Sequence, residues 1–335
     1  MKVAINGFGR IGRTVFRLML ERDDVEVVGL NDLYDPEVLA YMLRRDSVMG
    51  NFRGRAQVEG DQLMTDQGPV KMMAVKSPAE LPWGDLGVDV VIEASGVFRK
   101  RDQIEQHLAA GAKKVLLTVP AKDPIDAMIV LGVNDEMLKP GHKLVSNASC
   151  TTNCLAPLAY VLDREFGIEY GLMTTCHAYT NDQRLVDSPH KDWRRARAAA
   201  INIIPTTTGA ARAVGKVLPH LEGRLDGTSL RVPVACGSIV DLVSMMKREV
   251  TVDEVNAAMK KASESDQLRD ILAYAEDPLV SSDIVGDPHS SIFDPGTTAV
   301  LHGRMLKTMA WYDNEWGYSN RVLDLAVRMH EIGYE

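Results

Sequence analysis

The first part of the chain alternates short apolar runs with segments in which apolar residues recur every three or four positions. Short apolar runs are typical of strands and the longer spacing is typical of amphipathic helices, so this pattern predicts repeated strand–helix units. The predicted strands are 2–6, 25–30, 88–93 and 114–118, and the predicted helices are 10–21, 35–44 and 101–110. Strands that alternate with helices favour a parallel, doubly wound sheet.

Beyond residue 150 the pattern changes to longer extended runs. A helical stretch comes first, over Leu155–Leu162. The extended runs that follow are 171–176, 229–234, 240–247 and 307–312, and further helices are predicted over 252–262 and 320–332. We interpret these runs as a largely antiparallel sheet in a second domain.

A glycine-rich turn follows the first predicted strand. Gly7, Gly9 and Gly12 form the pattern G-x-G-x-x-G and open the first predicted helix. The first glycine permits the tight turn, the second lets a pyrophosphate approach the backbone, and the third allows close helix–strand contact. Asp32 follows about 20 residues later, where an acid binds a ribose hydroxyl and repels a 2′-phosphate. This context predicts NAD binding; the alternative is a glycine turn that binds no dinucleotide.

The expected fold class is therefore α/β, with a Rossmann-type doubly wound parallel sheet plus an α+β catalytic domain. The first domain is expected to cover residues 1–149 and the second 150–315. A terminal helix, about 316–335, is expected to pack back on the first domain.

Composition narrows the classes of function. The chain has 335 residues, enough for about two domains, with 45% apolar and 25% charged residues. Its net charge of −8 gives no support to a nucleic-acid or anionic-membrane partner. The four cysteines form no Cys-x-x-Cys pair and the eight histidines have no zinc-ligand spacing, so no metal is expected. With no signal-peptide or membrane-span pattern, we expect reduced cysteines and a cytoplasmic location.

Cys150 is the strongest candidate for chemistry. It lies in the run Ser-Asn-Ala-Ser-Cys-Thr-Thr-Asn-Cys, just before the apolar stretch that predicts a helix. Unpaired backbone N–H groups and the helix dipole favour an anion at a helix N-terminus, so the thiol pKa is expected to be lowered. A thiolate is a nucleophile, and this placement predicts covalent catalysis.

A catalytic thiol needs a base, and anionic substrates need donors. His177 follows a predicted strand, and the ends of strands often deliver side chains into clefts, so His177 is the candidate base. A histidine with a purely structural role is an alternative of equal weight. Thr206–Gly209 precedes a helical pattern over 210–217, so its N–H groups are suited to a phosphate. Arg231 lies in a strand-like run and needs a partner or a ligand. The basic run 194–197 is either an anion site or a solvated charged face.

The chain resembles phosphorylating glyceraldehyde-3-phosphate dehydrogenases from end to end. The segments that carry the resemblance are 5–12, 93–98, 146–157, 177–183, 190–209 and 311–320. The run around Cys150, together with Trp-Tyr-Asp-Asn-Glu-Trp-Gly-Tyr over 311–318, is highly specific. The resemblance implies that Cys150 attacks the aldehyde of glyceraldehyde 3-phosphate, that His177 acts as the base, and that inorganic phosphate attacks a thioester to release 1,3-bisphosphoglycerate.

The resemblance also implies roles for further residues and an assembly. The substrate phosphate would be held by Thr180, Asp182 and Arg231, and the attacking phosphate by Ser149, Thr151, Arg195, Thr208 and Gly209. Besides the glycines, NAD would contact Arg10, Ile11, Asp32, Lys76, Thr118 and Asn314, with Asn314 orienting the carboxamide. The family is usually a homotetramer in which the loop 180–204 packs near a neighbour's cofactor.

Several alternatives stay open at this point. In the nearest alternative, the substrate is another phosphorylated aldehyde, such as erythrose 4-phosphate. In a different class, the chain is an NAD-binding interaction protein with secondary catalysis. Ser188 stands where leucine is common and leaves the strictness of NAD over NADP open. Cys154 and Cys176 are interpreted as small core residues, although the spacing of Cys154 from Cys150 also allows a resolving thiol for an oxidised Cys150.

Overall fold

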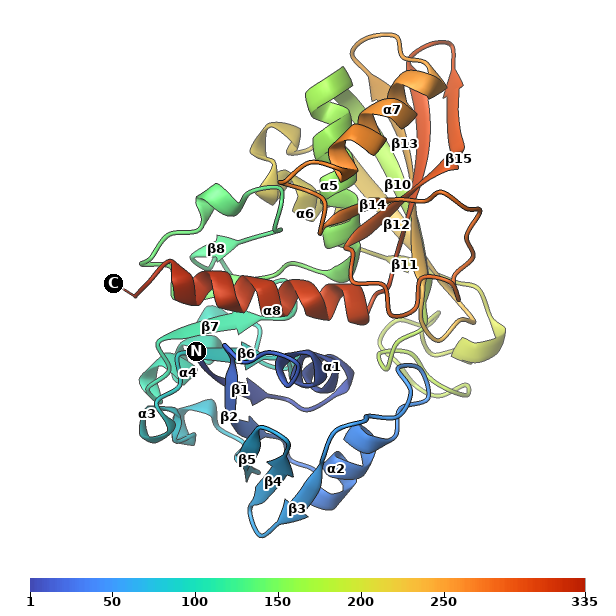
Figure 1. Ribbon diagram of the computed structural model, residues 1–335. Coiled ribbons are helices and arrows are strands. Elements are labelled where there is room, and N and C mark those ends of the chain that lie inside the picture. The colour runs from blue at the N-terminus through green and yellow to red at the C-terminus, as the bar shows by residue number, and fades with distance from the viewer. Residues whose placement is uncertain (335) are drawn as a thin grey trace. The chain divides into compact units, whose positions relative to one another are not determined.

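The computed structural model describes residues 1–334, which form two compact units (Figure 1). Among the described residues, the first unit comprises 1–129, 135–148 and 319–334, and the second comprises 130–134 and 149–318. Each unit is built on its own sheet. Within the described part of the chain, no helix combines the length and apolarity that a membrane crossing requires.

The sheet of the first unit has nine strands in the order β3-β4-β5-β2-β1-β6-β7-β9-β8. Its strands are β1 (Lys2–Asn6), β2 (Glu26–Asn31), β3 (Gln57–Glu59), β4 (Gln62–Thr65), β5 (Gly68–Met73), β6 (Val90–Glu93), β7 (Lys114–Leu117), β8 (Ala127–Met128) and β9 (Leu144–Ser146). The central strand β1 pairs in parallel with β2 and β6, which confirms the predicted doubly wound sheet. The antiparallel pairs β3–β4 and β4–β5 extend one edge and were not predicted.

Helices connect these strands. The connecting helices are α1 (Arg10–Met19), α2 (Pro36–Arg44), α3 (Trp83–Leu86) and α4 (Arg101–Ala109), and the terminal helix α8 (Trp316–Glu331) follows the last strand of the chain. The α2 helix begins after Asp35, whose carboxylate accepts the Glu37 N–H at 2.9 Å and so satisfies one of the unpaired donors of the first turn. From Ser319 onward α8 belongs to the first unit, where the Lys114 ammonium donates to the Met329 carbonyl at 2.9 Å.

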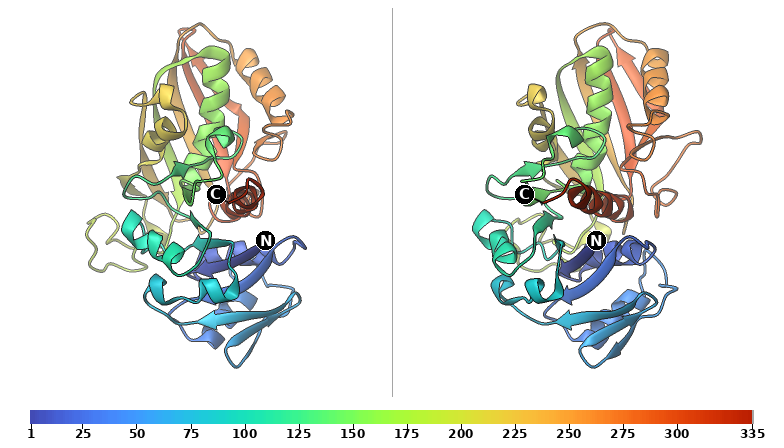
Figure 2. Two further views of the ribbon diagram at one scale, coloured as in Figure 1. Left: turned by 90° about the vertical axis from the view of Figure 1, so that its left-hand side faces the viewer. Right: turned by 60° about the vertical axis from the view of Figure 1, so that its left-hand side comes forward.

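The sheet of the second unit has seven strands in the order β11-β12-β10-β13-β16-β15-β14. These are β10 (Ile168–Ala178), β11 (Ile204–Thr207), β12 (Leu225–Val232), β13 (Ser238–Met246), β14 (Leu272–Tyr274), β15 (Ser291–Leu301) and β16 (Met305–Tyr312). Most neighbours are antiparallel, as predicted, but β10–β12 and β14–β15 are parallel. Figure 2 shows α5 (Cys150–Phe166) crossing one face of this sheet between α6 (Ala210–Val217) and α7 (Val252–Ser263).

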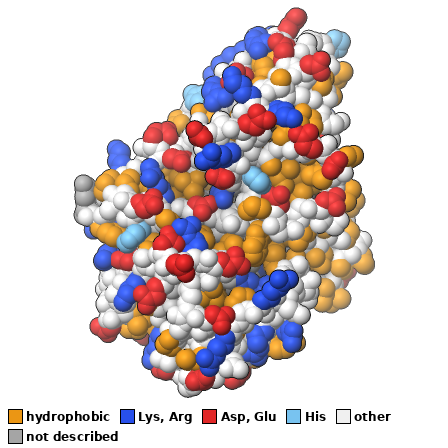
Figure 3. Space-filling model, in the orientation of Figure 1, with side chains coloured by type: hydrophobic (Ala, Val, Ile, Leu, Met, Phe, Trp, Pro, Cys, Tyr) orange, Lys and Arg blue, Asp and Glu red, His pale blue; other side chains and the backbone are white. Residues whose placement is uncertain are grey.

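The surface carries mixed charge. On the face shown in Figure 3, Lys and Arg side chains alternate with Asp and Glu side chains over both units. Such interspersed charge is typical of soluble domains and keeps local fields weak.

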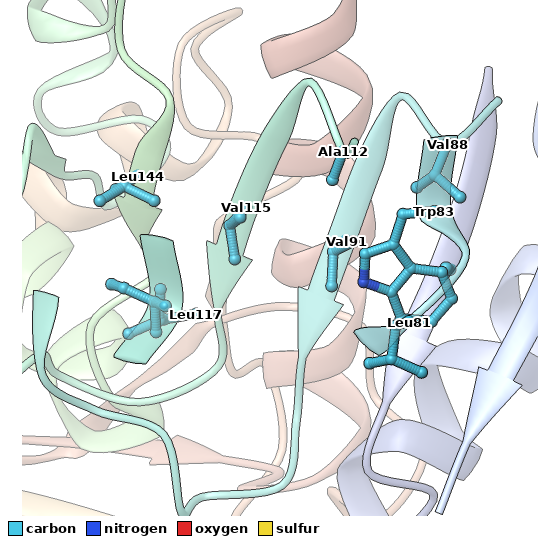
Figure 4. Close-up of a cluster of buried hydrophobic side chains, with 10 residues drawn as sticks. Leu81, Trp83, Val88, Val91, Ala112, Val115, Leu117 and Leu144 are labelled. Carbon is cyan, nitrogen blue, oxygen red and sulfur yellow. The ribbon is translucent and has the colours of Figure 1, made fainter. Parts of the chain in front are cut away.

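Under the glycine turn, the core of the first unit holds a buried polar chain. Figure 4 shows the Trp83 indole among apolar side chains of this core. The indole N–H donates to Nδ1 of His107 at 2.9 Å, so Nε2 carries the ring proton and donates to Glu93 at 3.0 Å. Glu93 also accepts the Asn6 amide at 2.6 Å and the Ser95 N–H at 2.9 Å. Glu93 therefore ties together the carboxyl ends of β1 and β6, where the glycine turn begins.

Candidate active site

The α5 helix begins at Cys150, as the sequence predicts. Ser149 is its N-cap, and the Ser149 hydroxyl accepts the Thr152 N–H at 3.1 Å. The preceding Ala148 has a φ of 56°, a left-handed conformation that costs a non-glycine residue free energy and is concentrated at functional sites. The sharp turn brings the thiol to the first turn of the helix, where the backbone N–H groups have no carbonyl partner within the helix.

His177 lies opposite this thiol. It is the penultimate residue of β10, one position past the predicted strand. Its Nε2 is 3.4 Å from Sγ of Cys150. On the other side of the ring, Nδ1 lies 2.7 Å from the Ala178 carbonyl oxygen and 2.6 Å from a guanidinium nitrogen of Arg231. The sequence-predicted nucleophile, base and arginine are therefore in direct contact.

Burial keeps the thiol and the imidazole in their neutral forms. Desolvation, reinforced by the positive charge of Arg231, lowers the pKa of His177 to about 3. Desolvation also raises the pKa of the Cys150 thiol, while Arg231 acts in the opposite direction. The expectation of a lowered thiol pKa is therefore wrong for this structure, because the cost of burying a thiolate exceeds the stabilisation by the helix N-terminus. Both groups are therefore neutral in this structure, with Nε2 of His177 beside the Cys150 thiol.

Tyr312 holds the base and the first turn of α5 in place, and sequence reasoning missed it. Its hydroxyl bonds to the hydroxyls of Thr151 at 2.8 Å and Thr175 at 2.9 Å. Its ring meets the His177 ring edge-on, with centroids 5.9 Å apart. Tyr312 ends β16, and no spacing or composition signal connects that strand end to Cys150. Thr151, predicted as a phosphate ligand, is 4% exposed, so its hydroxyl serves this contact in the structure.

The other predicted anion ligands form a second group around Arg195. The Arg195 guanidinium pairs with Asp182 and donates to the Thr206 hydroxyl at 2.8 Å. Thr208 and Gly209 lie at the start of α6, where Gly209 is the N-cap. Coulombic effects of Arg195 act on His177 and on Arg231, so the two groups share one electrostatic environment.

The backbone of Thr180 is held by Gln183, a residue that the sequence analysis did not single out as functional. The Thr180 N–H donates to the side-chain oxygen of Gln183 at 3.2 Å, and Gln183 is buried. This bond closes the turn after β10 and holds the Thr180 backbone. Its only sequence signal is the spacing of three residues within the matched segment 177–183.

Asn314 follows β16 in the second unit. Its side-chain oxygen accepts the Ser238 hydroxyl at 2.9 Å and the Gly237 N–H at 3.2 Å. Two donors on the oxygen settle which way the amide is turned. The NH₂ group of Asn314 is therefore the donor that remains for a ligand.

The glycine turn of the first unit fits a dinucleotide. A Cβ on Gly7 would lie 2.4 Å from the Ser95 nitrogen, and one on Gly12 would lie 2.1 Å from the Gly7 oxygen, so both positions require glycine. A Cβ on Gly9 would meet no atom within 4 Å, which leaves the backbone open to a phosphate. Asp32 braces the turn by accepting the Phe8 N–H at 2.7 Å.

The remaining predicted cofactor residues lie in the same unit. Arg10 forms a two-point ion pair with Asp46, at 2.9 and 3.2 Å. Ile11 is half-buried at the start of α1, and Lys76 is exposed after β5. The Thr118 hydroxyl donates to the Glu93 carbonyl at 3.1 Å. Among residues 1–334, no cluster of three or more His, Cys, Asp or Glu side chains is arranged to hold a metal ion.

Cys154 is fully buried one helical turn after Cys150. Its Sγ lies 3.6 Å from the Ser291 hydroxyl and 3.6 Å from the Ala310 carbonyl oxygen. Burial raises the pKa of the Cys154 thiol, which makes it a poor resolving thiol. The contacts favour the interpretation of Cys154 as a core residue.

Replacing Arg231 by glutamine is expected to shift alkylation of Cys150 by the neutral reagent iodoacetamide to higher pH. The reason is that Arg231 is the charge that lowers the pKa of the Cys150 thiol. The measurement is the alkylation rate as a function of pH, followed by mass spectrometry. Arg212→Gln, which alters an exposed arginine of α6 paired with Asp226 of β12, is the control. An unchanged profile in Arg231→Gln would refute the electrostatic role.

Comparisons with known proteins agree with this geometry. Residues 1–101 match the family model described as "Glyceraldehyde 3-phosphate dehydrogenase, NAD binding domain", and residues 149–314 match the model of the C-terminal domain. A glyceraldehyde-3-phosphate dehydrogenase of Streptomyces coelicolor is 56% identical over 329 residues, 98% of each chain. One from Borreliella burgdorferi is 56% identical over 98% of this chain and 99% of its own. One from Mycobacterium tuberculosis is 55% identical over 97% of both. The chain belongs to the glyceraldehyde-3-phosphate dehydrogenase family.

Proposed function

We propose that the protein oxidises glyceraldehyde 3-phosphate to 1,3-bisphosphoglycerate with NAD and inorganic phosphate. The observation that carries this proposal is the 3.4 Å contact between Cys150 Sγ and His177 Nε2 at the N-terminus of α5. Family membership supports the choice of substrate and cofactor. Residues 1–149 are assigned to NAD binding and residues 150–315 to catalysis, in a cytoplasmic enzyme of glycolysis or gluconeogenesis.

The first step is attack by the Cys150 sulfur on the aldehyde carbon. His177 Nε2 takes the thiol proton as the C–S bond forms, because neither thiolate nor imidazolium is favoured beforehand. The proton then passes to the carbonyl oxygen and gives a neutral thiohemiacetal. The step ends with neutral His177 and a neutral thiohemiacetal on Cys150, so no charge stays buried.

The second step is oxidation at the same carbon. NAD, when bound, accepts the hydride. His177 takes the hydroxyl proton of the thiohemiacetal, and the electron pair of that O–H bond forms the thioester carbonyl. Asn314 presents its NH₂ group to the carboxamide, and the first-unit ligands are Gly7, Gly9, Arg10, Ile11, Gly12, Asp32, Lys76 and Thr118.

The third step is phosphorolysis of the thioester. Phosphate oxygen attacks the carbonyl carbon, the C–S bond breaks, and protonated His177 returns a proton to the departing sulfur. Arg231, with Thr180 and Asp182, is assigned to the substrate phosphate. The attacking phosphate is assigned to Ser149, Thr151, Arg195, Thr208 and Gly209. Guanidinium and backbone N–H donors suit both anions because charge-assisted hydrogen bonds are strong.

The protein is also proposed to assemble as a homotetramer. The side of the second-unit sheet that α5 leaves open exposes Tyr170 (56%) and Leu172 (69%) on β10. The loop after β10 exposes Leu185 and Trp193, at 78% and 87%. Apolar surface of this extent is typical of protein interfaces, and a second copy of the chain is the partner that the family implies.

The proposed substrate and cofactor are tested by comparing two aldehydes and two cofactors. The specificity constant kcat/KM is expected to be higher for glyceraldehyde 3-phosphate than for erythrose 4-phosphate, and higher for NAD than for NADP because Asp32 repels a 2′-phosphate. Initial rates of reduced-cofactor formation measure both ratios. A preference for erythrose 4-phosphate would assign the other substrate, and equal use of NADP would overturn the cofactor assignment and implicate Ser188.

A further inference from the structure

The Ser238 hydroxyl joins two parts of the site that lie on different strands. Ser238 begins β13, which lies between β10 and β16 in the sheet. The neighbouring β10 carries His177, and Asn314 follows β16. The Ser238 oxygen accepts the Ala178 N–H at 3.1 Å and donates to the side-chain oxygen of Asn314 at 2.9 Å. Ser238 is 1% exposed, so no solvent replaces either bond.

We infer that Ser238 is a positioning residue for hydride transfer, which fixes the Asn314 amide relative to the backbone that carries His177. This role presupposes the dehydrogenase activity proposed above. Hydride transfer requires the base, the thiohemiacetal and the nicotinamide to be aligned together, and misplacement by a fraction of an ångström is costly. Ser238 is the side chain that connects the base-bearing strand to the residue assigned to the nicotinamide.

The donor protons and acceptor lone pairs of these groups fix the direction of both Ser238 hydrogen bonds. A serine hydroxyl has one proton, and a backbone N–H can only donate. The Ala178 N–H therefore uses an oxygen lone pair of Ser238, and the hydroxyl proton goes to Asn314. The Gly237 N–H donates to the same oxygen at 3.2 Å, so a flipped amide would set its NH₂ group against an N–H that can only donate. The amide is locked with its NH₂ group free to serve the carboxamide oxygen.

The turn before β13 holds this arrangement rigidly. Gly237 has a φ of +91°, and a Cβ there would lie 2.2 Å from the Ser281 carbonyl oxygen. Only glycine fits, so the backbone N–H that shares the Asn314 oxygen has a fixed position. Ser238 is the next residue, and the register between β13 and β16 pairs it with Tyr312.

The test compares Ser238→Ala with Ser244→Ala in the full-length enzyme. Ser244 lies on the same strand and is equally buried, and its hydroxyl has no hydrogen-bond partner. Ser238→Ala is expected to lower kcat/KM for NAD by about tenfold, since a buried unpaired group and a loosened ligand cost this much. Ser244→Ala is expected to stay within about twofold. Ser238→Thr, which keeps the hydroxyl, is expected to recover most of the loss.

A double-mutant cycle with Asn314→Ala separates positioning from general damage. If Ser238 acts through Asn314, adding Ser238→Ala to Asn314→Ala changes kcat/KM for NAD little further. Additive losses, or equal losses in Ser238→Ala and Ser244→Ala, would overturn the inference. If Ser238→Ala does not fold, Ser238→Cys, a weaker donor of similar size, is expected to show the same loss. A wild-type enzyme that forms no NADH would instead refute the proposed function.

Discussion

Cys150→Ser is expected to lower kcat for NADH formation by about four orders of magnitude or more. A serine hydroxyl at this position is a far weaker nucleophile, and loss of a covalent nucleophile has effects of this size in other enzymes. NADH absorbance at saturating aldehyde, NAD and phosphate measures it. Binding of NAD is expected to be retained, because the glycine turn belongs to the first unit.

Cys176→Ser is the matched control for this variant. Cys176 is half-buried on β10 next to His177, but alternation along a strand places its side chain on the opposite face. Its kcat is expected to stay within about twofold of the wild type. Comparable losses in both cysteine variants would contradict the assignment of Cys150 as the nucleophile.

His177→Asn is expected to lower kcat by about two to four orders of magnitude, the range for loss of a general base. Asparagine has a similar size but takes no proton from the thiol or from the thiohemiacetal hydroxyl. Steady-state rates across pH measure this effect. Retention of wild-type kcat at neutral pH would show that another group moves these protons.

His177→Asn, which is expected to impair activity, is also expected to reduce the loss of folding stability that occurs as the pH falls. Burial lowers the pKa of His177 from 6.5 to about 3 in the folded protein. Between those values the unfolded chain binds a proton that the folded chain does not, so stability falls as pH falls, by about 1.4 kcal/mol per pH unit from this group. His177→Asn removes this loss. Urea unfolding near neutral pH and midway through the window checks it, with the exposed His302→Asn as the control.

Local signals account for the elements that were predicted. The strand β1 and the helix α6 were predicted with their observed bounds, because each has an uninterrupted pattern and a glycine at its boundary. The strand β15 was missed because Asp294-Pro295-Gly296 resembles a turn; the strand accommodates it as a shift in register between Asp294 and Ala299. The strands β3 and β4 were missed because they are short and lie at one edge of the sheet.

The site shows the same division between local and tertiary information. Helix context predicted Cys150 as a nucleophile and a strand end predicted His177 as its base, and the structure brings the two side chains together. Tyr312 and Ser238 were not identified, because their roles depend on the register that pairs them across β13 and β16. The direction of the Cys150 pKa shift was also wrong, since burial by distant segments is not visible in the local sequence.

The central claim is that oxidation and phosphorylation are coupled through a thioester on Cys150. The most direct measurement is NADH formation from glyceraldehyde 3-phosphate and NAD, with and without inorganic phosphate. With phosphate, sustained turnover is predicted; without it, a burst of at most one NADH per Cys150 is predicted, because the thioester is not released. Sustained NADH formation without phosphate would contradict the account and indicate a dehydrogenase that hydrolyses its intermediate to a free acid.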